Sequence, residues 1–447
     1  MLGAKSSGLH LVVRMQKDGE GYYGVLDSVD QGAKLPIERA SFDQNKVRFE
    51  VKAVEGVFEG TLDKSATVLN GTWTQKGVPA QPLSLERDKN AIASATRDDN
   101  KSVKKVDGKP FLIPLLASVS NPPNAVNTNG KSYLVYEINL ANMGKSDCSI
   151  EALDVLSKDG SQTLASLKGR NLAKMFREGK DADRAPNIIG AAENGLIFVW
   201  VESDASVDKL PDSLKNKLSI KVGTYPEPLE LSMLPVKVDK SAIQTLGNPF
   251  PAGEWSALNG PGNDSVHRRA VVPLEGKPFI GQRFAIDWVQ YYPDGKTYKG
   301  DPKDNRSYKC YGQDLLAVAD GTVCRIKDGI KENVPGPVRA VPITLETLCG
   351  NHVVLDIGGG HYAFYAHMQP GSQTVKFGDK VKKGQVLGKL GNTGNSDEPH
   401  LHLHICNGPD PVGSDGIPYF FNYDRKDGSK TSTVTGMPLQ NDVVLFK

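Results

Sequence analysis

At 447 residues the chain is longer than one ordinary folding unit, and typical domain sizes of about 100–200 residues suggest three domains. Its 38% hydrophobic and 24% charged residues are typical of a soluble globular protein, and its net charge of +2 argues against a nucleic-acid-binding protein, which needs a concentrated basic face. No apolar run approaches the roughly 20 residues of a membrane-spanning helix, so we expect no membrane span. The 46 glycines and 28 prolines favour many turns and a mainly β, multi-domain architecture.

Residues 1–88 contain short strand-like runs separated by Gly, Asp and Asn. The run "KVRFEVKAV" alternates apolar and charged residues, as a strand with one buried face does. A small N-terminal β barrel fits this pattern. The phrase "GVFEGTLDKSATVLNGTWTQ" resembles the lipocalin-like N-terminal modules of exported bacterial hydrolases. Such a barrel either is filled by its own side chains, as small barrels usually are, or carries a small apolar ligand.

Residues 89–108 are polar, charged and free of aromatic side chains, which predicts a linker. Residues 109–245 return to strand-like runs, among them "SYLVYEINLAN", "GLIFVWVES" and "KLSIKVGTY". Their number and spacing predict a β-sandwich domain. No cluster of His, Cys or paired carboxylates occurs there, so we expect a spacer or an interaction module.

Residues 246–265 are dense in Gly, Pro and Asn and mark the start of a C-terminal domain over 246–447. The cysteines form no C-x-x-C pair, which argues against a cysteine-based zinc site. Either one or two disulfides or buried free thiols fit their positions. The cysteines are Cys148, Cys310, Cys324, Cys349 and Cys406.

The segment "HLHLHI", which begins at His400, carries the strongest chemical signal. Successive side chains of a strand point to opposite faces, so His400, His402 and His404 share one face at intervals of about 6.6 Å. Three imidazoles on one face are costly to bury without partners, and imidazole is the commonest zinc ligand. The pattern therefore indicates a metal site on this strand.

Further strands lie upstream. "GNHVVLDIGGGHYAFYAHM" predicts a hairpin of residues 352–357 and 361–367, with His367 at the end of its second strand. "RFAIDWV" predicts a strand that ends near Asp287, and "DLLAVADGTVCRI" predicts a hairpin that turns at residues 320–321. A metal centre assembled on a rigid sheet needs such residues from separate strands.

The ordered pieces "LLAVADGTV", "GNHVVLDI", "YAHM", "GDKVKKGQVLGKLGNTGN" and "PHLHLHI" resemble the lysostaphin/LytM-type zinc endopeptidases. The resemblance extends from Phe279 to Ile405 and implies an antiparallel β-sheet peptidase domain that binds Zn²⁺. In that family a His and an Asp of an H-x-x-x-D motif and the second His of H-x-H hold the zinc. The resemblance therefore implies Asp287 and His402 as metal ligands and His367 and His400 as the catalytic pair.

The chain departs from this pattern at the first ligand, where Arg283 stands four residues before Asp287. Arginine keeps its proton in proteins and cannot bind zinc. We expect His267 to replace it: if residues 267–273 and 278–287 pair about a turn at Gly276, residue i faces residue 551 minus i. His267 would then lie one cross-strand step from the vacated position. A register error of one residue would turn it to the opposite face.

At His404 the family usually has a glutamate. This histidine is a further metal ligand, a group behind the ligands or an exposed side chain, and we expect the last.

The leading functional hypothesis is a zinc metalloendopeptidase that hydrolyses stem or bridge peptides of bacterial peptidoglycan. The alternative is a degenerate, metal-free domain of the same type that acts as a regulatory or partner-binding module of the cell envelope. The resemblance implies a periplasmic or secreted protein. The residues before Ser7 lack the apolar core of a signal peptide, which leaves a cytoplasmic protein and an exported one without its signal both open. The sequence does not indicate an oligomeric state.

Overall fold

The computed structural model describes residues 2–6, 9–18, 21–28, 33–87, 113–177, 184–223, 225, 227–427 and 430–447. The chain divides into two compact units, Met1–Phe111 and Leu112–Lys447. The predicted linker, residues 89–108, lies outside the described residues. In the described part of the chain, no helix combines the length and the apolar character that crossing a membrane requires.

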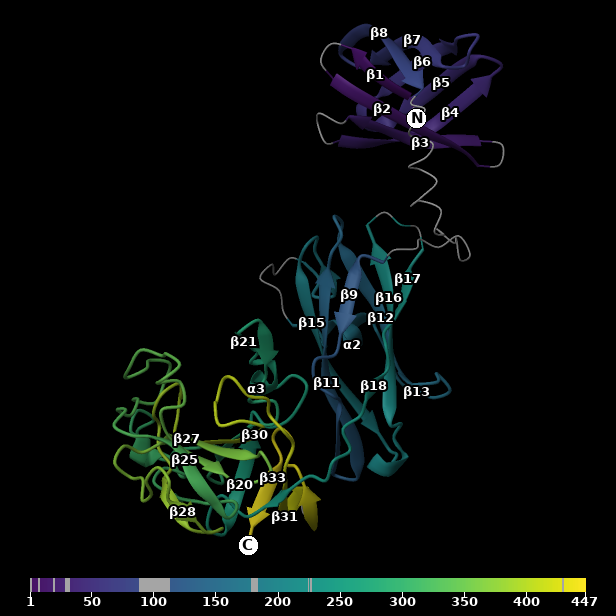
Figure 1. Cartoon of the computed structure of the whole chain (residues 1–447). Coiled ribbons are helices and arrows are strands. Elements are labelled where there is room, and N and C mark those ends of the chain that lie inside the picture. The colour runs from purple at the N-terminus through teal and green to yellow at the C-terminus, as the bar shows by residue number, and fades with distance from the viewer. Residues whose placement is uncertain are drawn as a thin grey trace. The chain divides into compact units, whose positions relative to one another are not determined.

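The first unit is a closed barrel of antiparallel strands (Figure 1). Consecutive strands pair with each other, and β1 closes the barrel by pairing with β8. The strands are β1 (Leu2–Ser6), β2 (Leu9–Asp18), β3 (Gly21–Ser28), β4 (Ala33–Asp43), β5 (Lys46–Val51), β6 (Gly56–Leu62), β7 (Val68–Gln75) and β8 (Val78–Arg87), with a 3₁₀ turn at Lys52–Val54.

Apolar side chains fill the barrel. On β5, Val47, Phe49 and Val51 are buried and the charged residues between them are not, as the period-2 pattern predicts. The Phe49 ring stacks on Phe58, with 4.9 Å between centroids. The cluster is completed by Val13, Leu26, Ile37, Leu69, Leu83 and Leu85. This packing favours the filled barrel over the ligand carrier, and the lipocalin-like character stays a prediction.

The second unit begins with two sheets packed face to face. The first sheet contains β9 (Leu115–Ser118), β10 (Asn124–Thr128), β11 (Lys131–Asn142) and β15 (Asn194–Ser203). The second contains β12 (Cys148–Ser157), β13 (Thr163–Lys168), β14 (Ile188–Ile189), β16 (Ser213–Val222), β17 (Leu229–Ser232) and β18 (Val236–Lys237). Short helical turns lie at α2 (Gly169–Ala173) and Val207–Lys209. We call these two sheets the sandwich.

Strand β11 is buried on both faces. Leu134, Tyr136 and Ile138 point into the core of the sandwich. Tyr133 and Val135, on the other face, belong to the core cluster of the next sheet. The sandwich therefore packs against the C-terminal part of the same unit through this strand. Whether residues 109–245 and 246–447 are separate domains stays a prediction.

The C-terminal part is built on one large sheet, which we call the C-terminal sheet. Its order is β19-β31-β33-β20-β23-β30-β27-β26-β25-β28, with β32 beside β31. The strands are β19 (Thr245–Leu246), β20 (Gly253–Leu258), β23 (Ile286–Val289), β25 (Gly321–Lys327), β26 (Asn351–Asp356), β27 (Tyr362–Met368), β28 (Lys380–Val381), β30 (Leu401–Cys406), β31 (Phe420–Asp427), β32 (Lys430–Gly436) and β33 (Val443–Phe446). Beside it lie the helix α3 (Val266–Arg269), the 3₁₀ turn Asn305–Ser307 and the strand pairs β21 (Val272–Leu274) with β22 (Lys277–Phe279) and β24 (Asp314–Leu316) with β29 (Val386–Lys389).

The predicted hairpin of residues 352–357 and 361–367 is confirmed. Strands β26 and β27 pair as expected, and Gly358–Gly360 turn between them with φ values of 83°, 66° and 77°. The hairpin expected about residues 320–321 is wrong, because β24 pairs with β29 whereas β25 pairs with β26 and β28. A turn signal at that point therefore marks a change of sheet.

All five cysteines are free thiols. Cys148, Cys310 and Cys406 are buried, and Cys324 and Cys349 are half-buried. Burial raises the pKa of the Cys310 and Cys406 thiols to about 12. These residues therefore act as small apolar side chains of the core.

Candidate metal centre

Three neighbouring strands of the C-terminal sheet carry predicted site residues. Asp287 on β23 pairs with His402 on β30, and His402 pairs with Ala366 on β27. His367 follows Ala366 on β27, and His400 directly precedes β30. Asp287 is the second residue of β23, which ends two residues later at Val289. The strand pairing brings these four residues together from distant parts of the chain.

His267 reaches the same place by a route that differs from the prediction. The expected register is confirmed, since Val272 pairs with Phe279, but the expected length of the hairpin is wrong. Each strand has three residues, and Pro273 pairs with Pro278. The ladder runs past the two prolines and ends at Val272 and Phe279, so residues 267–271 are not part of it. His267 therefore lies on α3, and its side chain approaches Asp287 from there.

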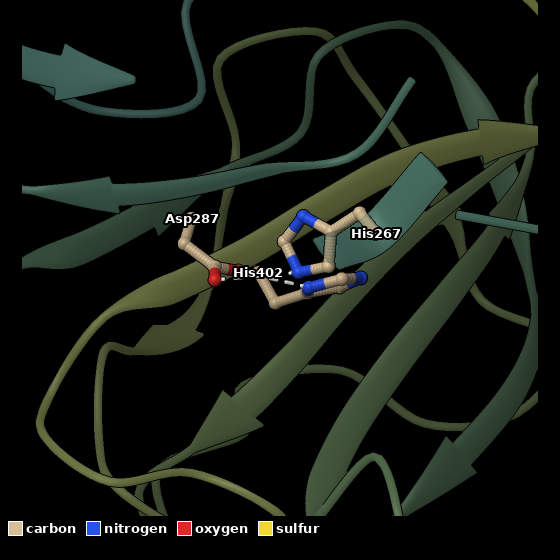
Figure 2. Close-up of side chains that lie close together, drawn as sticks. All are labelled: His267, Asp287 and His402. Atoms are coloured by element: carbon tan, nitrogen blue, oxygen red, sulfur yellow. Dashed lines mark hydrogen bonds and ion pairs between the residues drawn. The ribbon is translucent and has the colours of Figure 1, made fainter. Parts of the chain in front are cut away.

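Figure 2 shows the side chains of His267, Asp287 and His402 turned toward one another. His402 Nδ1 lies 2.9 Å from Asp287 Oδ1, and His267 Nε2 lies 3.3 Å from Asp287 Oδ2. One ligand atom from each residue falls within 4.8 Å of the others. Two atoms about 2.0–2.1 Å from one tetrahedral zinc ion are about 3.3–3.4 Å apart. Two imidazoles and a carboxylate at this spacing fit zinc in both chemistry and size.

Asn259 orients two of these three residues. Its backbone carbonyl lies 2.9 Å from His267 Nδ1, and its side-chain amide donates to Asp287 Oδ2 over 2.9 Å. A carbonyl only accepts, so His267 Nδ1 carries a proton, which leaves Nε2 as the nitrogen that a metal could take. Asn259 thus fixes the tautomer that a metal ligand requires. The analysis of motifs missed this residue, because it belongs to none of them.

His404 is buried, which makes the expectation of an exposed side chain wrong. Its exposed fraction is 2%, and its ring stacks on Phe364 with 4.6 Å between centroids. His404 Nδ1 lies 2.9 Å from His402 Nε2, and His404 Nε2 has no hydrogen-bond partner. Burial holds the pKa of His404 well below its ordinary value. His404 is therefore a neutral group behind His402, at the nitrogen that points away from Asp287.

His367 and His400 flank the three ligand atoms. His367 Nδ1 lies 2.7 Å from the Thr393 carbonyl, and His400 Nδ1 lies 2.8 Å from the Glu398 carbonyl. Each ring therefore donates from Nδ1 and leaves Nε2 for chemistry. His400 Nε2 lies 3.3 Å from Asp287 Oδ1, and the two rings are 4.8 Å apart.

The pKa values of His367 and His400 are shifted in opposite directions. Burial, together with His400 and His402, holds the pKa of His367 well below its ordinary value. Burial also opposes the charged form of His400, but Asp287 more than offsets it and raises the pKa of His400. His367 has a φ of 64°, a left-handed conformation that is uncommon for a residue other than glycine. Its backbone N–H donates to the Cys349 carbonyl over 3.0 Å, which helps to hold this conformation.

All five predicted site residues line one cavity of about 490 Å³. Other polar residues of its lining are Asn259, Gln282, Arg339, Asn395, Ser396, Asp397 and Glu398. Arg339 Nη1 and Asp397 Oδ1 form an ion pair of 2.7 Å at the cavity. A larger cavity of about 1180 Å³ lies along the sandwich and the β21–β22 hairpin, and no His or Cys is among its described lining residues. The predicted site residues therefore gather at the smaller cavity.

Arg283, in the place of the expected first ligand, does not point to Asp287. It is buried, and its Nη2 donates to Glu137 Oε2 over 2.9 Å and to Asp415 Oδ1 over 3.1 Å. Its Nη1 donates to the Gly416 carbonyl over 2.9 Å. Arg283 is therefore part of a buried ion-pair cluster. The motif analysis missed Glu137, because this residue is 146 positions away in the sequence.

Comparison with protein families matches residues 307–413 to "Peptidase family M23". This segment contains His367, His400 and His402, and Asp287 and His267 precede it. The match shows that residues 307–413 are similar to peptidase family M23 and confirms the resemblance to lysostaphin-type endopeptidases.

Two curated relatives are similar to parts of the chain. Glycyl-glycine endopeptidase ALE-1 of Staphylococcus capitis is 30% identical over 121 residues, which are 27% of this chain and 30% of the relative. Peptidoglycan DD-endopeptidase ShyC of Vibrio cholerae is 42% identical over 56 residues, which are 12% of each chain. The match thus spans less than a third of either relative. The solved catalytic domain of the antimicrobial peptidase lysostaphin from Staphylococcus simulans is 21% identical, with 37% of this chain and 88% of that chain covered and a TM-score of 0.20.

Proposed function

We propose that the chain is a zinc metalloendopeptidase that hydrolyses peptide cross-links of bacterial peptidoglycan, with the peptidase family M23 domain at its catalytic centre. The observation that carries the proposal is the convergence of one ligand atom each from His267, Asp287 and His402 within 4.8 Å at one cavity. Three protein ligands and one open position are the usual make-up of a catalytic zinc site.

In the proposed reaction His367 and His400 have different roles. A zinc ion in this site would polarise the scissile carbonyl and lower the pKa of water to about 7. His367 donates from Nδ1 to a backbone carbonyl, so its Nε2 is free to accept the proton of the attacking water. His400, whose pKa Asp287 raises, would stabilise negative charge that develops on the carbonyl oxygen.

The proposed substrate class rests on the activities named for the relatives. One is a glycyl-glycine endopeptidase and one a peptidoglycan DD-endopeptidase, so both act on peptide bonds. We propose stem or bridge peptides of peptidoglycan as the substrate, and a periplasmic or secreted location in which the chain meets them. The barrel and the sandwich would position the catalytic part in the cell envelope.

The second candidate function is a metal-free domain that binds a partner of the cell envelope. Arg283 in the first ligand position favours it, because no metal could bind there. His267 weakens it, because this histidine supplies a third ligand atom 3.3 Å from Asp287 Oδ2. The two functions differ in whether the purified chain binds zinc.

Digestion of purified peptidoglycan tests the proposed activity. The wild-type chain with zinc should release soluble peptides and new amino groups, and His402→Ala should release none. His361→Ala is the matched control, since His361 lies outside the cavity and bonds to Gln244. Equal release by wild type and His402→Ala would contradict the proposal.

A further inference from the structure

One acidic side chain lies on the face of β11 that turns toward the C-terminal sheet. Tyr133 and Val135 occupy this face, and Glu137 follows at the same two-residue spacing. Glu137 is 6% exposed. A buried carboxylate between two packed sheets strongly disfavours folding unless it is paired. The packing of the sandwich against the C-terminal sheet therefore requires charged partners for Glu137.

Two arginines from the C-terminal part pair with Glu137. Arg268 donates from Nη1 to Oε1, and Arg283 donates from Nε to Oε1 over 3.2 Å and from Nη2 to Oε2 over 2.9 Å. Asp415 accepts from Arg283 over 3.1 Å and makes the cluster neutral, with two cations and two anions. Burial alone would raise the pKa of Glu137, but Arg283 and Arg268 lower it to about 2. Glu137 is therefore a carboxylate held by both guanidinium groups.

The same contacts hold α3. The helix has four residues, and a single turn is not stable without tertiary contacts. Arg268 Nη2 donates to the carbonyls of Tyr136 over 2.9 Å and Val199 over 3.2 Å, a paired couple on β11 and β15. Arg269 donates to backbone carbonyls within residues 174–176 over 2.5–2.6 Å. The helix is thus fastened to the sandwich by the residues that directly follow His267.

We infer that Glu137 of the sandwich is a positioning residue of the metal centre: by holding Arg268 and Arg283, it places His267 against Asp287. The inference rests on the proposed function insofar as His267 is a metal ligand. It makes the sandwich a part of the zinc site and not only a spacer. A neighbour that fixes a ligand in this way typically changes metal affinity by about 10–100-fold.

Arg283 connects the buried cluster to the metal centre. In the lysostaphin-type motif its position holds the first zinc ligand, whereas here its side chain belongs to the cluster with Glu137 and Asp415. The third ligand comes from α3 instead, and α3 depends on the same cluster through Arg268. Arg283, which stands in the usual ligand position, and α3, which carries His267, are thus held by the same cluster of ion pairs.

The test is the metal affinity of the full-length chain, measured by the absorption of bound Co²⁺ and by competition between Zn²⁺ and a chelator. Glu137→Gln keeps the shape of the side chain and removes the charge that holds the two arginines. We expect Co²⁺ and Zn²⁺ to bind about 10–100-fold more weakly than to the wild-type chain. If this variant does not fold, Glu137→Gln with Arg283→Met removes one charge of each sign and should show the same loss.

Tyr136→Phe is the matched control. It removes one buried hydrogen bond of the same strand, from Tyr136 Oη to Asn216 Oδ1 over 2.6 Å, and keeps the backbone carbonyl that Arg268 uses. Thermal unfolding of each variant gives its loss of stability. We expect the control to bind metal within about twofold of wild type, even where it loses as much stability as Glu137→Gln.

The outcomes separate the two claims. Weaker metal binding in Glu137→Gln alone supports the inference. Wild-type affinity in Glu137→Gln, or an equal loss in Tyr136→Phe, would overturn the inference and leave the proposed function standing. A wild-type chain that binds neither metal would overturn the proposed function and the inference with it.

Discussion

Asp287 and His402 face each other across the β23–β30 pair, with Asp287 Oδ1 2.9 Å from His402 Nδ1. Both residues lie on central strands of the C-terminal sheet, so backbone pairing alone fixes their separation. A site on paired strands is held more rigidly than one on loops. His267 is the exception, because its position depends on a one-turn helix that the sandwich holds.

Asp287→Asn should abolish tight zinc binding. The amide has nearly the same shape, but it lacks the charge that attracts the metal and offsets the nearby histidines. We expect at least about a 100-fold loss of affinity in chelator competition. His361→Gln, outside the cavity, should bind like wild type. Unchanged affinity in Asp287→Asn would remove this residue from the metal centre.

His367→Asn should lower kcat by about 10²–10⁴-fold and leave the zinc content unchanged, because the variant removes only the proton acceptor. Asparagine tolerates the left-handed backbone that His367 adopts with a φ of 64°, so the strand should keep its shape. Steady-state kinetics on a peptide substrate and zinc analysis of the same sample check both parts. Loss of zinc together with activity would assign His367 to the ligands.

His404→Leu should weaken zinc binding by about tenfold, because His402 Nε2 loses the group that orients its ring. Stability should change by less than about 1.5 kcal/mol. In wild type His404 Nε2 is buried without a hydrogen-bond partner. In the variant His402 Nε2 becomes a buried nitrogen without a partner in its stead, so the cost of one such nitrogen is present in both chains. Chelator competition and urea unfolding measure the two effects. A large loss of stability with full zinc affinity would make His404 a packing residue only.

Glu137 should give the chain a characteristic acid dependence. Its pKa is lowered from an ordinary 4.5 to about 2, so the stability that it contributes is present above pH 4.5 and is lost as the pH falls toward 2. Between pH 5 and pH 3 the difference in free energy of unfolding between wild type and Glu137→Gln should shrink by about 2 kcal/mol. Urea unfolding at both pH values measures it, and a difference that does not depend on pH would contradict a carboxylate at Glu137.

The strand pattern of the sequence predicts much of the site. Alternation in "HLHLHI" places His402 and His404 on one strand. The expected turn at Gly276 also gives the correct register of the β21–β22 pair, in which residue i faces residue 551 minus i. The same pattern cannot tell how far a pair extends, and this one ends after Val272 and Phe279. His267 consequently lies on a helix and still meets Asp287.

Contacts between distant segments lie beyond such patterns. The partners Glu137 and Arg268 are 131 residues apart, and no local signal links them. The burial of His404 was missed for a related reason: strand periodicity gives the face of a side chain but not what covers that face. Here Phe364 on the neighbouring strand covers His404.

Zinc per chain, measured by elemental analysis on purified wild type and His267→Ala side by side, tests the central claim most directly. We expect about one zinc per wild-type chain and little in His267→Ala, because the variant leaves only two protein ligands. Equal zinc in both would remove His267 from the site. No zinc in the wild-type chain, even after incubation with excess metal, would contradict the enzyme and favour the metal-free binding module.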